Sequence, residues 1–293
     1  SLLLTAPLFP LATSLAFQNL KEPSREFPFV RAWGTLGHVA GANLLSLWMH
    51  LSGRGLADSL LIAGLLALVN AGFALTLPHT PPSHEAGGRS AVGKALAMLK
   101  EPSFALLTAC LFVLIVFGSF YYARGPLYLQ ESGIAAKNLS ALLSLGQITE
   151  VFIVFGLGRL YERLGAKGTM LVGLAAWVLR FSFFAFGGFP FLIGAVALHG
   201  ICFGCWRIAA TMYADRLADR DARASVQSRM GLTADGAGHL LGNFLVGQTM
   251  LWGAVSSGTD WRFVWCVPLF GCAAVLLVFA AGFRGRKTED GRQ

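Results

Sequence analysis

Nine apolar stretches alternate with shorter polar segments along the 293-residue chain. An α-helix needs about 18–25 apolar residues to cross roughly 30 Å of hydrocarbon, and the stretches have this length or more. The pattern therefore predicts an all-α, polytopic membrane protein built as a helical bundle. The expected spans are residues 1–18, 31–51, 57–77, 103–124, 139–160, 168–187, 189–213, 222–252 and 261–283.

The composition excludes a soluble globular domain. Apolar residues make up 55% of the chain and charged residues only 13%, and the mean hydropathy is +0.61. Soluble domains carry about 25% charged residues. The net charge of +8 does not indicate a nucleic-acid partner, because sixteen of the 23 lysines and arginines lie in alternate connections between spans and three lie in the others. This asymmetry places residues 284–293 in the cytoplasm.

The longest polar segment between spans covers residues 78–102 and is rich in Pro, Ser and Gly. Such a composition is typical of a flexible linker. The segment separates three spans from six, which predicts two unequal parts. The chain begins at Ser1 within an apolar run and without a methionine, so we expect it to be cut from a longer protein.

An amide and an acid lie near the middle of the span 139–160, at Gln147 and Glu150. A carboxylate at this depth costs several kcal/mol or more, and it indicates an ion or substrate path. Arg180 lies at a matching depth in the next, antiparallel span. We therefore expect Glu150 and Arg180 to form an ion pair that affects proton binding.

Three further spans carry polar or aromatic side chains. Arg31, Thr35 and His38 share one helix face, and this face either points inward or lets Arg31 reach the lipid surface. Tyr122 precedes Pro126, which we expect to break its helix; the tyrosine belongs either to an interfacial aromatic belt or to a substrate site. Asp235, His239 and Asn243 recur every four residues on one face, and Gly238 and Gly242 are spaced for close helix packing.

The five cysteines all fall within expected spans. Cys202 and Cys205 have redox spacing, but in an apolar helix this spacing also places them one turn apart as small packing residues, which we favour. We expect no metal and no cofactor. An intramembrane enzyme is disfavoured, because the chain has no HExxH motif and no Ser/His pair with nucleophile spacing.

The segment Gly158–Lys167, GRLYERLGAK, is expected to form a tight charged turn. It resembles the G-x-L-x-D-R-x-G-R-K gating loop of the major facilitator superfamily, with Glu162 for Asp and Ala166 for a basic residue. The residues that carry the resemblance are Gly158, Glu162, Arg163, Gly165 and Lys167. It implies that 1–77 contains helices four to six of an N-terminal bundle, 78–102 the linker, 103–283 a C-terminal six-helix bundle and 284–293 a tail. Nine of twelve helices would then be present.

Within that superfamily the chain is similar to the nucleoside–proton symporters. The similarity rests on short segments in a specific order: Phe27–Gly37, Leu75–His79, Gly146–Glu150, Ala176–Phe181, Arg223–Gln227 and Thr259–Trp261. It implies uptake of nucleosides driven by protons, by a monomer in a bacterial inner membrane.

The resemblance also implies site residues. Arg31, Thr35, Gln147, Glu150 and Phe203 match positions that line the family's substrate cavity. Ser119 and Tyr122 replace a Gln and an Asn, His199 replaces a Tyr, and Gly204 replaces an acid for which Asp235 could substitute. The expected substrate-binding residues are therefore Arg31, Thr35, His38, Ser119, Tyr122, Gln147, Glu150, His199 and Phe203. The proton-coupling candidates are Glu150, Arg180 and Asp235.

Two other functions remain open from the sequence. A transporter of sugars or small aromatic acids would share the fold, and a membrane sensor could keep the fold without transport. The retained gating loop and the buried Gln147 and Glu150 argue against the sensor. The sequence does not distinguish between nucleosides or between coupling ions.

Overall fold

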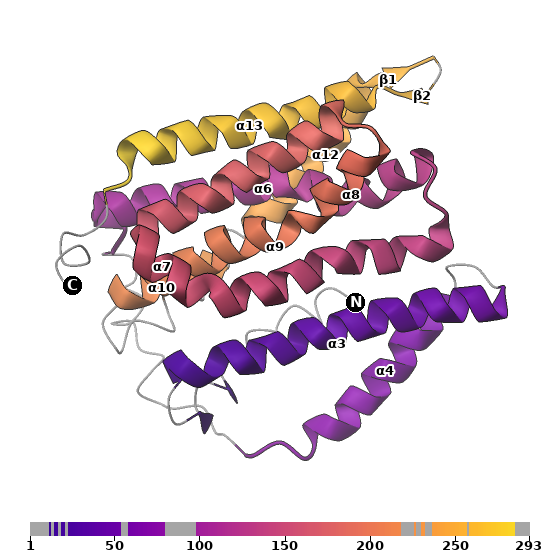
Figure 1. The fold of residues 1–293 in the computed structure, drawn as a ribbon, viewed down its shortest axis with the longest axis horizontal. Helices are drawn as coiled ribbons and strands as arrows, with labels where there is room; N and C mark the ends of the chain where they lie inside the picture. The colour runs from indigo at the N-terminus through magenta and orange to yellow at the C-terminus, as the bar shows by residue number, and fades with distance from the viewer. Residues whose placement is uncertain are drawn as a thin grey trace.

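The computed structural model describes residues 12, 15–16, 19–20, 23–53, 58–79, 98–217, 226, 230–231, 236–256 and 258–284, with only the backbone at 23–29 and 31. Long helices lying roughly side by side form this part of the chain (Figure 1). Within the described residues, four helical segments are long and apolar enough to cross a membrane: Pro102–Glu131, Ala136–Phe186, Phe189–Leu217 and Trp261–Gly282. The predicted all-α membrane bundle is confirmed.

Helix α6 (Pro102–Glu131) follows a short 3₁₀ turn, η1 (Met98–Lys100). The Glu101 carboxylate accepts a hydrogen bond from the Phe104 N–H, and proline at the first helical position needs no partner. The expected break at Pro126 is wrong, because α6 continues through it to Glu131. A proline is tolerated within a membrane helix when neighbouring groups compensate for the lost hydrogen bond.

Helix α7 (Ala136–Phe186) consists of two antiparallel arms (Figure 1). The arms meet at Gly165, whose φ of 66° and ψ of 178° are not helical. Glycine reaches positive φ without steric cost, so the reversal needs one residue only. The predicted turn over 158–167 is therefore too long, because 158–164 are still helical.

The next span consists of four segments in series. Helix α8 (Phe189–Ala197) leads through Leu198 to α9 (His199–Cys202), the π-helix η2 (Phe203–Ile208) and α10 (Ala209–Leu217). Together they form one apolar segment of 29 residues. π-Helical turns occur frequently at functional sites, because they rotate the side chains that follow.

Helices α12 (His239–Trp252) and α13 (Trp261–Gly282) are joined by a two-residue ladder of β1 (Ala254–Val255) and β2 (Gly258–Thr259). The Asp260 carboxylate accepts a hydrogen bond from the Phe263 N–H at 3.0 Å and caps α13. α13 packs on α6 and on α7, where Trp265 is fully buried against Phe181 and Phe184.

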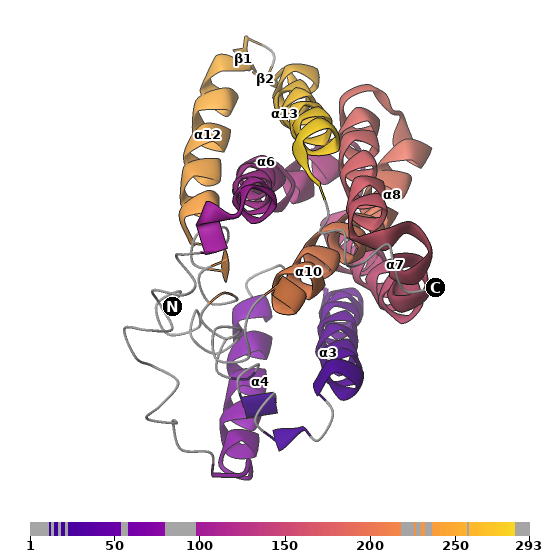
Figure 2. The same cartoon turned by 90° about the vertical axis from the view of Figure 1, so that its left-hand side faces the viewer.

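Helices α3 (Pro23–Ser52) and α4 (Asp58–Ala74) lie across the first arm of α7 from α6 and α13 (Figures 1 and 2). Three polar contacts join α3 to this arm. Asn43 Nδ2 donates to Ser144 Oγ at 3.1 Å, Ser46 Oγ donates to the Lys137 carbonyl at 2.5 Å, and His50 Nε2 lies 2.9 Å from Asn138 Oδ1.

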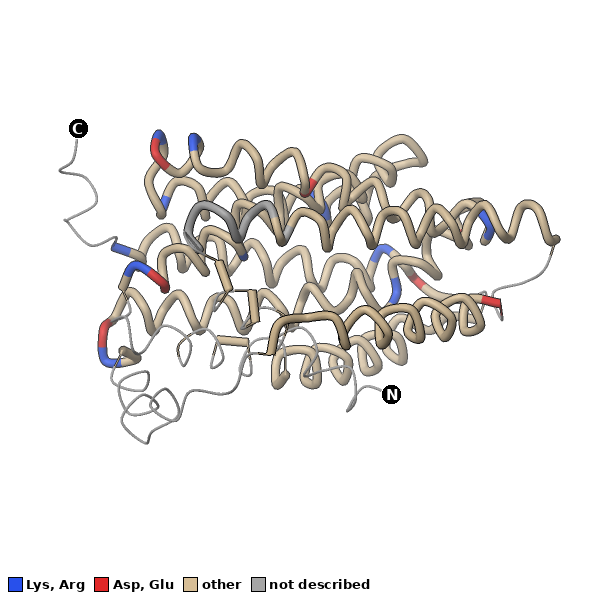
Figure 3. The backbone as a smooth tube through the Cα atoms, turned by 90° about the horizontal axis from the view of Figure 1, so that it is seen from below, with Lys and Arg blue, Asp and Glu red and all other residues tan. Residues whose placement is uncertain are grey.

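Charged residues gather toward the ends of the long helices, and the stretches between them contain few (Figure 3). This distribution is expected for membrane spans, because charge in the hydrocarbon region is costly. The few charges at mid-length are therefore candidates for a functional role.

A buried polar centre between α7 and α9

Glu150 lies in the middle of the first arm of α7, and its exposed fraction is 5%. Close contact between this arm and the α8–α9 segment positions it. Gly200 lies against the peptide that joins Thr149 to Glu150, and the Gly146 α-carbon lies against the Cβ of His199. Small residues allow membrane helices to approach in this way.

Hydrogen bonds support the same contact. Thr149 Oγ1 donates to the Ala197 carbonyl at 2.6 Å and accepts from the Gly200 N–H at 3.3 Å. These bonds satisfy backbone groups at the junction of α8 and α9, where the turn at Leu198 interrupts regular helical hydrogen bonding. His199, the first residue after this junction, is thereby held beside Glu150.

His199 lies between the acid and the base that the sequence paired directly. Its Nε2 is 3.9 Å from Glu150 Oε2, and its Nδ1 is 3.1 Å from Arg180 NH1. Arg180 comes from the second arm of α7, and all three side chains are at most 5% exposed. The expected Glu150–Arg180 pair is thus a three-residue centre in which the two charged groups contact opposite sides of one imidazole ring.

Aromatic rings surround this centre. The Arg180 guanidinium lies 3.5 Å from the centroid of the Tyr121 ring, a cation–π contact. Tyr121 and Phe203 stack on His199 with centroid separations of 6.0 and 5.9 Å. Tyr122 approaches His199 edge-on at 6.3 Å and is 48% exposed, so one of its faces remains accessible.

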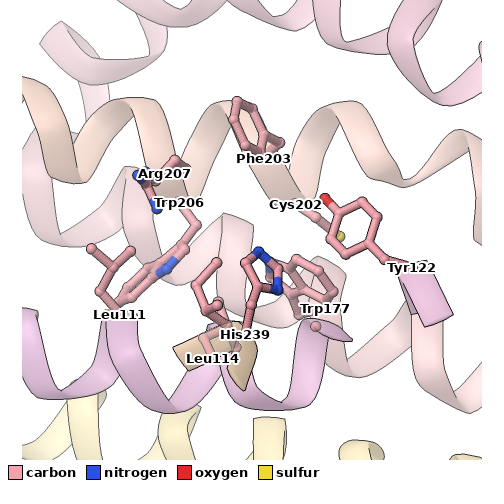
Figure 4. Close-up of a pocket in the computed structure, with 11 residues that line it drawn as sticks. Leu111, Leu114, Tyr122, Trp177, Cys202, Phe203, Trp206, Arg207 and His239 are labelled. Carbon is pink, nitrogen blue, oxygen red and sulfur yellow. The ribbon is translucent and has the colours of Figure 1, made fainter. Parts of the chain in front are cut away.

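A cavity of about 160 Å³ opens beside the centre (Figure 4). Tyr122 and Phe203, which the resemblance implied for the substrate cavity, both line it. The walls are mostly apolar and aromatic, which is typical of a small-molecule site. The other lining residues are Leu111, Leu114, Ile115, Gly118, Trp177, Cys202, Trp206, Arg207 and His239.

The expected site residue Ser119 contacts α12. Ser119 is buried, and its hydroxyl lies 3.0 Å from His239 Nδ1 and 2.9 Å from the Ile115 carbonyl. Gly242 packs against Ser119 and Gly238 against Ile115, so close packing at the GxxxG pair is confirmed. Ser119 lies behind the wall formed by Tyr122 and His239.

Gln147 is half-buried one turn before Glu150, and its Oε1 is buried with no hydrogen-bond partner among the described residues. On α3, Thr35 is buried and His38 is exposed. α3 packs on the first arm of α7, which carries Glu150. The Arg31 side chain and Asp235 lie outside the described residues.

The gating-loop residues lie around the reversal of α7. Glu162 and Arg163 are exposed, and Lys167 Nζ donates to the Ala280 carbonyl at 2.7 Å near the end of α13. The Arg216 guanidinium lies 4.7 Å from the Tyr161 ring, which joins α10 to the first arm of α7. Cys202 and Cys205 are buried free thiols in the adjacent segment.

Comparisons with known proteins identify what the chain is similar to. The sequence profile of the nucleoside H⁺ symporters matches residues 2–288. The chain is 29% identical over 301 residues to the xanthosine permease of Escherichia coli (strain K12), covering 95% of this chain and 71% of the permease. It is 27% identical over 299 residues to the nucleoside permease NupG of the same organism, covering 94% and 69%.

A solved structure has the same fold. A crystal structure of the nucleoside transporter NupG superposes with a TM-score of 0.77 and 24% identity, covering 92% of this chain and 70% of that one. At this identity the likeness shows a shared fold.

Proposed function

Because the chain belongs to the nucleoside H⁺ symporter family, we propose that it couples nucleoside uptake to proton movement through the buried centre at Glu150. The observation that carries this proposal is a membrane-embedded carboxylate held beside a histidine and an arginine, next to an aromatic cavity. Polar groups at mid-membrane, between helices that rearrange, are the usual basis of alternating access.

The polar part of the substrate would bind to the first arm of α7. Ribose hydroxyls need acceptors and donors, which the Glu150 carboxylate and the Gln147 amide supply. The buried Gln147 Oε1 has no hydrogen-bond partner among the described residues, and a ribose hydroxyl would satisfy it. Thr35 and His38 on α3, together with Arg31, would complete the opposite wall.

The base would lie against aromatic faces. Phe203 and Tyr122 line the cavity beside His199, and Trp177 and Trp206 extend its apolar surface (Figure 4). Planar bases stack favourably on such rings. Ser119 would position His239, which lines the cavity, through the hydrogen bond between their side chains. These residue roles, and a contribution from Asp235, are proposals that mutagenesis can test one by one.

The proton would bind within the centre formed by Glu150, His199 and Arg180. We propose that the protein functions as a monomer in a bacterial inner membrane with residues 284–293 in the cytoplasm, as the distribution of lysine and arginine indicates. In that orientation the Gly158–Lys167 reversal is cytoplasmic.

Transport in proteoliposomes tests the function. The vesicle lumen is made more alkaline than the external medium, so that protons are driven inward. Radiolabelled uridine, adenosine and xanthosine are added outside, and accumulation of at least one nucleoside is expected. An uncoupler should abolish accumulation but leave exchange of internal for external nucleoside intact. Accumulation that is unchanged by the uncoupler would refute proton coupling.

Competition separates nucleosides from the other substrate classes. Unlabelled nucleosides should reduce uptake, whereas a hexose and a small aromatic acid at the same concentration should not. Inhibition by the sugar or the acid with no effect of nucleosides would transfer the assignment to that class.

A further inference from the structure

The buried guanidinium of Arg180 donates to a histidine ring. Arg180 is fully buried, and it contacts His199 Nδ1, the faces of Tyr121 and Trp177, and the Cys202 thiol. Its Nε and NH2 atoms have no hydrogen-bond partner among the described residues. A buried charge is stabilised only where other groups compensate for lost hydration. The hydrogen bond to His199 supplies part of this compensation for Arg180.

The contact fixes the tautomer of His199. A guanidinium has five N–H donors and no acceptor, so Nδ1 of His199 must offer its lone pair to Arg180. A neutral imidazole carries its proton on the other nitrogen. The N–H of His199 is therefore at Nε2, the atom that lies 3.9 Å from the Glu150 carboxylate.

Arg180 and a second proton require the same lone pair. The imidazolium form of histidine donates from both nitrogens, so it cannot accept from Arg180. A proton that arrives at Nδ1 must displace the guanidinium by breaking the 3.1 Å contact, and it leaves a positive ring 3.9 Å from Glu150. Proton binding and the position of Arg180 are thus mutually exclusive alternatives at one atom.

The other groups around His199 do not remove this competition. Tyr121 and Tyr122 face the ring from α6, His38 interacts with it electrostatically from α3, and Cys202 lies three residues along its own helix. Tyr121 and Tyr122 present ring faces or edges to His199. Arg180 is the donor whose hydrogen bond to Nδ1 the structure defines.

We propose that His199 is the residue that takes up the transported proton, and that Arg180 is a positioning residue that competes with this proton for Nδ1. The inference rests on the proposed nucleoside–proton symport and names the atom at which coupling takes place. Protonation of His199 would then move the Arg180 side chain, which the second arm of α7 carries, away from Nδ1. Glu150 would serve as the counter-ion of the protonated ring.

Proton counting in detergent solution tests the proposal. Purified protein in weak buffer with a pH-indicator dye receives a saturating amount of whichever nucleoside it transports, and the protons taken up or released per bound nucleoside are measured across pH. His199→Gln keeps an acceptor for Arg180 and a donor for Glu150 but cannot bind the proton. It should lose the nucleoside-linked proton exchange seen in the wild type.

A second variant tests the role of Arg180. Arg180→Met removes the competing donor, so proton exchange should persist to a pH about one unit higher, a roughly tenfold change in proton affinity. Cys205→Ala, a buried neighbour that does not line the cavity, should behave like the wild type. If Arg180→Met does not fold, the His199→Gln result decides alone.

Other results overturn the inference. His199→Gln that exchanges wild-type numbers of protons would show that Glu150 or another group carries the proton. An unmoved pH profile in folded Arg180→Met would exclude competition at Nδ1. A wild-type protein that binds no nucleoside would instead contradict the proposed function itself.

Discussion

The α-carbon of Gly200 lies against the backbone nitrogen of Glu150, so the acid is held where two helix backbones touch. A side chain at position 200 would overlap the peptide that carries Glu150. The location of the polar centre therefore depends on a glycine as much as on the charged residues themselves. The same contact brings His199 beside Glu150.

Gly200→Ala should destabilise the protein by separating α9 from the first arm of α7. Overpacking of a tight contact costs about 1–3 kcal/mol, and nucleoside transport should fall because His199 moves away from Glu150. Thermal unfolding in detergent measures the stability and proteoliposome uptake the activity. Gly247→Ala is the matched control, because a Cβ there meets no atom within 4 Å. Equal melting temperatures for both variants would disprove the argument.

Phe203→Ala should weaken nucleoside binding, because it removes one aromatic face from the cavity (Figure 4). Loss of a stacking contact of about 1 kcal/mol corresponds to roughly fivefold weaker binding. Phe203→Tyr should keep the affinity close to that of the wild type. Isothermal titration gives the dissociation constants, with Phe152→Ala as the control because that ring is 71% exposed. Unchanged affinity in Phe203→Ala would place the base elsewhere.

A cross-link between α3 and the first arm of α7 should stop transport. Asn43 and Ser144 are joined by a 3.1 Å hydrogen bond across the two helices. In the double variant Asn43→Cys, Ser144→Cys, a short bifunctional methanethiosulfonate should tie the helices together and prevent the rearrangement that alternating access needs. Reduction should restore uptake. Each single-cysteine variant treated identically should remain active, and continued transport by the cross-linked double variant would show that this contact does not open.

The sequence was sufficient for the apolar helices but not for all of their ends. Span length and hydropathy predicted α3, α4, α6, α13 and both arms of α7, because lipid exposure requires long apolar helices. The expected ends at Pro126 and over 158–164 were wrong. A membrane helix has no water to satisfy released carbonyls, so a proline interrupts it less than in a soluble protein, and Gly165 alone completes the reversal.

The buried centre was only half predictable. Counting residues along two antiparallel spans matched the depths of Glu150 and Arg180, yet depth does not fix the rotation of each helix about its axis. His199 was expected in the substrate cavity from the family resemblance, but its place between Glu150 and Arg180 was not. His239 was indicated by its four-residue spacing from Asp235 and Asn243, whereas Trp177 lies in a continuous apolar run, where no periodicity distinguishes a cavity wall from packing.

Glu150→Gln provides the most direct test of the proposed coupling. The amide keeps the shape and hydrogen-bonding ability of the side chain but removes the charge beside His199. Concentrative uptake driven by a proton gradient should fall to background in this variant, while the wild type accumulates the same nucleoside. Comparable amounts of folded, inserted protein are verified by size-exclusion chromatography and reconstitution yield.

The measurement is radiolabelled nucleoside accumulation in proteoliposomes, with and without an uncoupler, for the wild type and Glu150→Gln side by side. The account predicts accumulation by the wild type that the uncoupler and the mutation each abolish. Accumulation against a gradient by Glu150→Gln would contradict it.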